Sequence, residues 1–218
     1  MAMPNRKLAL YLAGCTVSVM AVMAVLGIAT GASQELHEHF AQPEAYAMGL
    51  VEKGGALRVM MGLDLAFITL YTAFFAVQAA YLRERKQPAV LVWLGFGAIA
   101  LTALLDFVED HHILVLLDQA EARILPTVGA IAFQSVLSAV KFSCSFVGLV
   151  AFGLAIPRDT KLGLAFGMYL VVSTLLAAVM SYAAPPPFAT LETVRFGGFL
   201  IGFALAIAWL RTQPDVET

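Results

Sequence analysis

Charged side chains are scarce in this chain, and their scarcity excludes a soluble globular fold. Only 13% of the 218 residues are Asp, Glu, Lys or Arg, whereas 61% are hydrophobic. A typical soluble domain is about 45–50% apolar and about 25% charged. A soluble protein of this length has no interior large enough to hide so much apolar surface. We therefore expect a membrane protein.

Cysteines and the motifs of several familiar chemistries are also rare or missing. The two cysteines, Cys15 and Cys144, both lie in apolar segments, which excludes a disulfide framework and a CxxC metal site. The sequence has no HExxH zinc motif, no G-x-S-x-G nucleophile elbow and no phosphate-binding P-loop. It also has no basic patch, so we expect no nucleic-acid partner.

Long apolar runs are abundant, and their lengths match a lipid bilayer. A membrane-spanning helix needs about 20 mostly apolar residues. Six such runs occupy most of the chain, at residues 8–30, 57–82, 89–112, 127–156, 162–184 and 191–210. No repeat, low-complexity segment or linker divides them. We predict an all-α fold, a single polytopic domain over residues 1–218 with six transmembrane helices in contact with the lipid bilayer.

The distribution of basic residues predicts the orientation of these helices. Short cytoplasmic loops carry an excess of Lys and Arg. Eight of the thirteen Lys and Arg fall on the side of the two termini, four fall on the other side, and Lys141 lies within a helix. We therefore expect cytoplasmic N- and C-termini, in a bacterial inner membrane. The first run is too long for a signal-peptide core, so we predict a retained helix.

Two segments outside the six runs have distinct characters. Residues 31–56 form the longest predicted outer loop, which is polar and acidic, and we expect a short surface helix in it. Residues 113–126 mix apolar and charged side chains, which is typical of an interfacial segment lying partly on the membrane.

The strongest functional signal is the segment 106–112, Asp-Phe-Val-Glu-Asp-His-His, at the end of the third apolar run. Ionisable residues are costly in hydrocarbon, so a functional role is the default hypothesis for them. Helical spacing places Asp106 and Glu109 on one face. The same spacing puts His112 beside that face and directs His111 away from it, which makes His112 the better candidate.

Two neighbouring helices supply matching polar residues. Lys141 is the most deeply placed charge of the chain, and an ammonium at that depth needs a carboxylate such as Asp106 or Asp64. Gln134 lies seven residues before Lys141, and Tyr71 seven residues after Asp64, so each pair faces one seam of a helix bundle. The predicted ligand-binding residues are Asp64, Asp106, Glu109, Lys141, Gln134 and Tyr71.

A metal site is a second interpretation of the same region. The pair Glu109 and His112 has the i, i+3 spacing that carboxylate-bridged metal sites of helix bundles use. With Asp106 one turn earlier and His39 from the outer loop, these side chains offer oxygen and nitrogen ligands for zinc or iron. The spacing is common in helices, so solvated acids and histidines at the membrane interface are the competing interpretation.

Three hypotheses of function remain open. The first is a binding or carrier protein whose outward-facing site holds a small polar molecule, a lipid headgroup or a proton. The second is a metal-dependent hydrolase that acts on a lipid or amphiphile at the outer interface. The third is an accessory subunit of a larger membrane complex, in which the polar network is structural. Glycines spaced four apart, such as Gly163 and Gly167, allow close packing within the chain, in a homodimer or against a partner subunit. We favour the first hypothesis because it needs the fewest assumptions.

Overall fold

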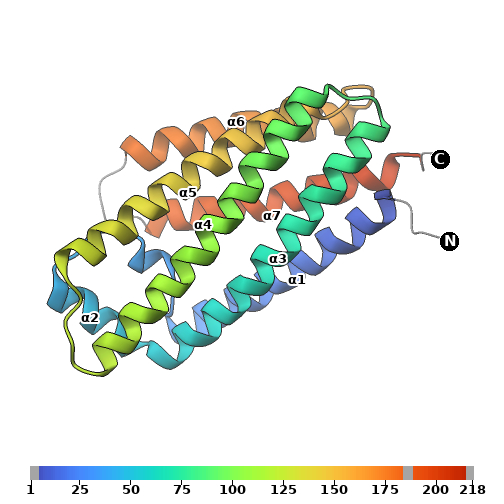
Figure 1. Cartoon of the computed structure of the whole chain (residues 1–218). Helices are drawn as coiled ribbons and strands as arrows, with labels where there is room; N and C mark the ends of the chain where they lie inside the picture. Colours follow the sequence, from blue (N-terminus) through green and yellow to red (C-terminus); the bar gives the residue numbers. More distant parts are fainter. Residues whose placement is uncertain (1–4, 184–188, 215–218) are drawn as a thin grey trace. The chain divides into compact units, whose positions relative to one another are not determined.

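The fold is entirely helical over the residues that the structure, a computed structural model, describes: the backbone of 5–183 and 189–214, and the side chains of these residues apart from 189–194. The helices in Figure 1 are α1 (Asn5–Thr30), the 3-10 turn η1 (Glu35–His37), α2 (Pro43–Glu52), α3 (Gly54–Glu84), α4 (Ala89–Glu121), α5 (Val128–Ala155), α6 (Lys161–Ala183) and α7 (Ala189–Thr212). All but η1 and α2 contain an apolar stretch long enough to cross a membrane. The predicted all-α fold with six transmembrane helices is thus confirmed, whereas the cytoplasmic placement of the termini stays a prediction.

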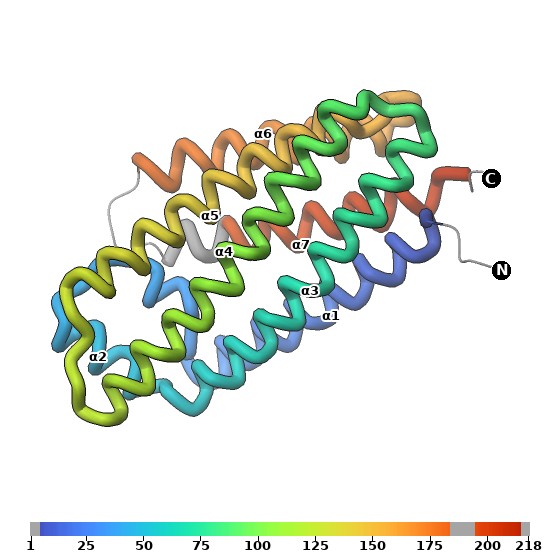
Figure 2. The backbone as a smooth tube through the Cα atoms, in the orientation of Figure 1, coloured from blue at the N-terminus to red at the C-terminus, as the bar shows by residue number. Residues whose placement is uncertain are grey.

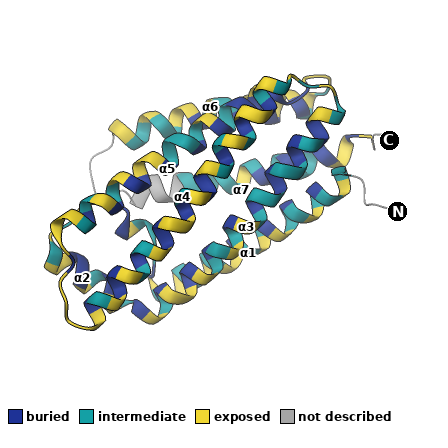
Figure 3. Ribbon diagram, viewed as in Figure 1, coloured by how far each residue is buried: buried dark blue, intermediate teal, exposed yellow. Residues whose placement is uncertain are grey.

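The surface of the long helices fits a lipid environment. Figure 3 shows that buried and exposed residues alternate along them, as expected where each helix packs by one side. Many exposed side chains are large and apolar, for example Ile28, which is 87% exposed, and Val90, which is 78% exposed. In water these side chains would be unfavourably placed, whereas lipid chains solvate them.

The main departure from the predicted helix limits concerns α4. The sequence predicted a helix end near residue 112 and an interfacial segment at 113–126, but α4 continues to Glu121. The predicted helix end is therefore wrong, whereas the position of residues 113–121 at the membrane interface stays a prediction. Ile113, Leu116 and Leu117 continue the buried face of the helix and pack in one core with Leu50 of α2. These three apolar side chains are covered by protein, whereas Val115 on the other side of the helix is 51% exposed.

The chain divides into two compact units. Unit 1 comprises Met1–Val17, Leu70–Leu101 and Ser143–Thr218, and unit 2 comprises Ser18–Thr69 and Thr102–Phe142. Helices α1, α3, α4 and α5 therefore each contribute residues to both units. The single domain over residues 1–218 stays a prediction.

Unit 1 combines an aromatic core with a polar network. The Trp209 ring packs against Tyr81 at 6.0 Å and against Phe166 at 5.8 Å between ring centroids. The Arg85 guanidinium binds the Asp159 carboxylate at 2.7 Å. At the same end, the start of α1 and the end of α7 lie side by side (Figure 2), because the Arg6 guanidinium donates to the carbonyl oxygen of Leu210 at 3.3 Å. These contacts join helices that are distant in sequence.

Glycines allow α5 and α6 to approach closely within unit 1. A Cβ atom built on Gly153 of α5 would lie 2.8 Å from the carbonyl oxygen of Gly167 of α6, and the reverse distance is also 2.8 Å. Both distances are shorter than any ordinary contact of a Cβ atom. Gly167, from one of the glycine pairs noted in the sequence, thus serves packing within the chain.

In unit 2, the segment that follows α1 packs against the end of α4 and the start of α5. Helix α1 ends because Gly31 adopts a left-handed conformation with φ +68°, and Pro43 starts α2 at its first turn. The short helix expected within residues 31–56 is therefore present. Figure 2 shows this segment, in blue, beside the end of α4 and the start of α5. The buried core there consists of Tyr46, Ala47, Leu50, Leu57, Met61, Ile113, Leu116, Leu117, Ala120 and Ile131.

Candidate functional site

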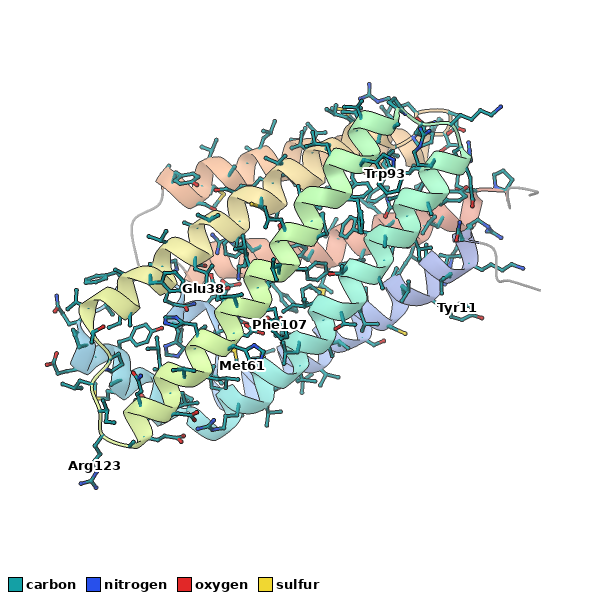
Figure 4. All side chains as sticks on the ribbon, in the orientation of Figure 1. Tyr11, Glu38, Met61, Trp93, Phe107 and Arg123 are labelled. Atoms are coloured by element: carbon teal, nitrogen blue, oxygen red, sulfur yellow. The ribbon has the colours of Figure 1, made fainter. Side chains whose placement is uncertain are left out.

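Unit 2 buries an unusual group of charged side chains. Each of these side chains belongs to a residue that is at most 9% exposed, and no other Asp, Glu, Lys or Arg in the described part of the chain is buried to this extent. The group consists of five carboxyl groups and one ammonium: Glu38, Asp64, Asp106, Glu109, Asp110 and Lys141. Figure 4 labels Glu38, which enters the group from the loop after η1, next to α4 and α5. Helices α3, α4 and α5 supply the other side chains.

Lys141 is the centre of this group. Its Nζ lies 2.8 Å from Oδ1 of Asp106 and 3.2 Å from Oε1 of Glu38, and it also binds Oε2 of Glu109. An ammonium has three N–H donors, and each has one carboxylate partner here. We call these four residues the Lys141 cluster. A buried ion pair is favourable only when hydrogen bonds compensate for lost hydration, and this arrangement supplies them.

Gln134 and His112 extend the Lys141 cluster along α4 and α5. The Gln134 amide donates from Nε2 to Oε1 of Glu109 at 3.1 Å, and its Oε1 accepts from Nδ1 of His112 at 2.7 Å. Glu109 thus has both carboxyl oxygens bound. His111 is exposed, and its Nδ1 lies 2.8 Å from the carbonyl oxygen of Phe107 on the same helix. The two adjacent histidines therefore face different surroundings, as helical spacing predicts.

Two aspartates form a second, separate part of the site. The carboxyl groups of Asp64 and Asp110 interact directly, and we call them the aspartate pair. The Gln34 amide donates from Nε2 to Oδ1 of Asp110 at 2.8 Å. The other oxygen of Asp110, Oδ2, is buried and has no hydrogen-bond donor among the described residues. Oε2 of Glu38, in the Lys141 cluster, is likewise buried without a donor, so two carboxyl oxygens of the site lack one among the described residues.

Contacts between His37 and Tyr46 hold the loop that places Glu38 in the site. The Tyr46 hydroxyl donates to the carbonyl oxygen of His37 at 2.9 Å, and the two rings pack edge to face at 5.5 Å. Burial lowers the pKa of His37 from 6.5 to about 4, so this imidazole is neutral at neutral pH. Burial, with the nearby charges of Glu109 and Glu38, raises the pKa of Tyr46 above its usual value. Neutral side chains therefore hold the turn that precedes Glu38.

The sequence anticipated most of the members of this group. The structure brings together five of the six predicted ligand-binding residues: Asp64, Asp106, Glu109, Lys141 and Gln134. Tyr71 is buried in unit 1, so its place in the site stays a prediction. Glu38 and Asp110 also belong to the buried group but were not among the predicted residues. The spacing of Asp110 from Asp106 carried a signal, because residues four apart share a helix face.

Glu38 had no comparable signal in the sequence. Glu35 and Glu38 stand in the same acidic loop, and nothing in the local pattern separates them. The 3-10 turn determines which of the two glutamates is buried, because it leaves Glu35 partly exposed and Glu38 only 3% exposed. A turn of this kind depends on the tertiary contacts of Tyr46 rather than on a sequence period.

Three of the four predicted metal ligands, Glu109, His112 and Asp106, bind other side chains. The fourth is His39. Glu109 binds Lys141 and Gln134, and His112 binds Gln134 through Nδ1. Over residues 5–183 and 189–214, no group of three or more His, Cys, Asp or Glu is arranged to hold a metal ion. Zinc or iron at these residues stays a prediction, which elemental analysis of the purified protein tests.

The chemistry of the site must be inferred from its own residues. No family model matches the chain, and neither a curated protein nor a solved structure is significantly similar to it.

Proposed function

We propose that this membrane protein binds and releases a proton at the buried carboxyl groups of unit 2. The observation that carries the proposal is the imbalance of five buried carboxyl groups against one buried ammonium. Unpaired charge is very costly in a medium of low polarity. Because the protein supplies one positive charge here, bound protons or another cation must offset the remaining negative charge.

A proton suits the site better than a larger ligand. Several of the carboxyl oxygens already accept hydrogen bonds from protein donors, namely from Lys141, Gln134 and Gln34. A polar molecule or lipid headgroup would have to displace these donors. A proton adds no volume and needs only one acceptor oxygen.

The loop between α1 and α2 offers the route to water. It contributes Gln34 and Glu38, which both bind residues of the site. Gln34 is only partly buried, so water reaches its surroundings. We further propose that this loop faces the periplasm of a bacterial inner membrane, since basic residues are more frequent on the opposite side.

The competing interpretation is a structural network within an accessory subunit. Ion pairs such as Lys141 with Asp106 can fix the register of helices without any exchange of protons. The two interpretations differ in one observable property. A structural network keeps one protonation state over the pH range in which the protein is folded, whereas a proton-binding site changes its state.

Infrared difference spectroscopy tests the proposal. The purified protein in lipid vesicles is compared in mildly acidic and mildly alkaline buffer. We expect the C=O band of a protonated carboxyl group that shifts to lower frequency in D2O and disappears reversibly in alkaline buffer. Asp118→Asn is the matched control, because Asp118 is exposed on α4 and paired with Arg58 at 2.6 Å. A carboxyl band that is absent, or that does not respond to pH, contradicts the proposal.

A further inference from the structure

We infer that the aspartate pair, Asp64 and Asp110, shares the exchangeable proton. The inference rests on the proposed function and assigns it to two residues of the site. It is based on the distribution of hydrogen-bond donors among the carboxyl oxygens of unit 2. In the Lys141 cluster, by contrast, each carboxylate accepts a hydrogen bond from the Lys141 ammonium, which favours its charged form.

The Lys141 cluster is poorly suited to take up a proton. Glu109 receives N–H groups from both Lys141 and Gln134. Asp106 accepts from the same ammonium at 2.8 Å. A proton on either bound oxygen of Glu109, or on Oδ1 of Asp106, would displace a hydrogen bond that is already made. Hydrogen bonds to a charged group are stronger than those between neutral groups, so this exchange is unfavourable. Oε2 of Glu38 has no donor among the residues that the structure describes, but Oε1 of the same carboxylate accepts from the Lys141 ammonium, which favours its charged form.

The aspartate pair differs from the cluster because Asp110 accepts from the neutral amide of Gln34 rather than from an ammonium. Asp110 is 0% exposed and Asp64 is 7% exposed, so bulk water hardly reaches either carboxyl group. Oδ2 of Asp110 has no donor within the described part of the chain. An O–H group on Asp64 would supply the missing donor. Two adjacent carboxylates cannot readily both be charged, and pairs of this kind hold one proton between them.

Proton exchange at the pair is chemically simple. On uptake, a hydronium ion transfers its proton to one carboxylate oxygen, and the pair changes from two negative charges to one. On release the O–H bond breaks and water accepts the proton, so no redox partner or other co-reactant is needed. Gln34 donates to the opposite oxygen of Asp110 and thereby orients that carboxyl group. Gln34 is a positioning residue, since it gains and loses no proton.

The infrared titration assigns the band to residues when it is repeated on variants. We expect Asp64→Asn and Asp110→Asn each to abolish the pH-dependent carboxyl band. Asp118→Asn, which removes an exposed carboxylate of α4 outside the site, should retain the band. Elution of each variant as a single species in size-exclusion chromatography establishes that it is folded.

The outcomes separate the inference from the proposed function. A band that titrates in the wild type and persists in both aspartate-pair variants overturns the inference and leaves the proposed function in place. The absence of any titrating band in the wild type overturns both.

A further variant keeps the test open if the aspartate-pair variants do not fold. Gln34→Leu removes the donor to Asp110 without changing any charge. We expect the carboxyl band to persist at a shifted frequency, because the hydrogen bonding of the pair has changed. A spectrum identical to that of the wild type contradicts the inference.

Discussion

At the scale of single residues, the buried ammonium of Lys141 is central to the electrostatics of the site. It is 4% exposed and binds three carboxylates. We expect Lys141→Met to destabilise the folded protein by about 3–5 kcal/mol, because removing one partner leaves buried charge without compensation. Thermal denaturation followed by size-exclusion chromatography measures this loss. Adding Glu109→Gln to Lys141→Met should recover part of it.

A matched control separates this effect from the loss of any lysine. Lys53 has a side chain that is 42% exposed and pairs with Glu52 at 3.2 Å. Exposed pairs of this kind contribute at most about 1 kcal/mol, so Lys53→Met should have little effect. Equal destabilisation by the two substitutions would contradict the role assigned to Lys141.

His37 makes the loop that carries Glu38 sensitive to acid. Its pKa is about 4 in the fold and 6.5 when exposed, so the opened loop binds a proton more readily than the folded loop. The stabilisation is complete above pH 6.5 and is lost as the pH falls towards 4, with a total of about 3 kcal/mol. Hydrogen exchange of residues 31–42 at several pH values measures the opening. In His37→Phe, which keeps a ring against Tyr46, the opening should lose this pH dependence.

The residues of the site were predictable where a helix carries them. Asp106, Glu109 and Lys141 follow from helical spacing combined with the cost of charge in lipid. Glu38 was not predictable, because its position depends on a turn that Tyr46 fixes from another helix. The pairing of Asp64 with Asp110 was also out of reach, since it depends on the relative rotation of α3 and α4 about their axes.

At the scale of the elements, the backbones of α5 and α6 approach closely at Gly153 and Gly167. Gly153→Ala would place a Cβ atom 2.8 Å from a backbone oxygen, which a helix cannot avoid without moving. We expect a destabilisation of about 1–3 kcal/mol, measured as a lower midpoint of thermal denaturation. Gly97→Ala is the matched control, because nothing lies within 4 Å of a Cβ atom at that position of α4. A neutral result for Gly153→Ala would contradict the close packing.

The end of α4 shows that predicting each helix separately leaves out the packing between helices. The apolar residues from Ile113 to Leu117 were compatible both with an interfacial segment and with a buried helix. The outcome depended on α2, which covers that face and contributes Leu50 to the shared core. Sequence periodicity identifies an apolar face but does not identify the element that covers it.

At the scale of the whole molecule, hydropathy was sufficient to predict six membrane-crossing helices, and the charges of the loops predict their orientation. Cysteine labelling tests the orientation in a background in which Cys15 and Cys144 are replaced by alanine. We expect Arg123→Cys, in the loop after α4, to react with an impermeant maleimide added from outside the inner membrane. Lys86→Cys, in the loop between α3 and α4, should react only after the membrane is permeabilised. The reverse pattern would show that the site faces the cytoplasm.

The most direct test of the account is a count of the protons that the folded protein exchanges. The wild type and Asp110→Asn, both in lipid vesicles made permeable to protons, are moved from mildly acidic to mildly alkaline buffer, and a pH indicator reports the protons released. The account predicts that each wild-type chain releases one proton more than each Asp110→Asn chain. Equal release by the two folded proteins would contradict it.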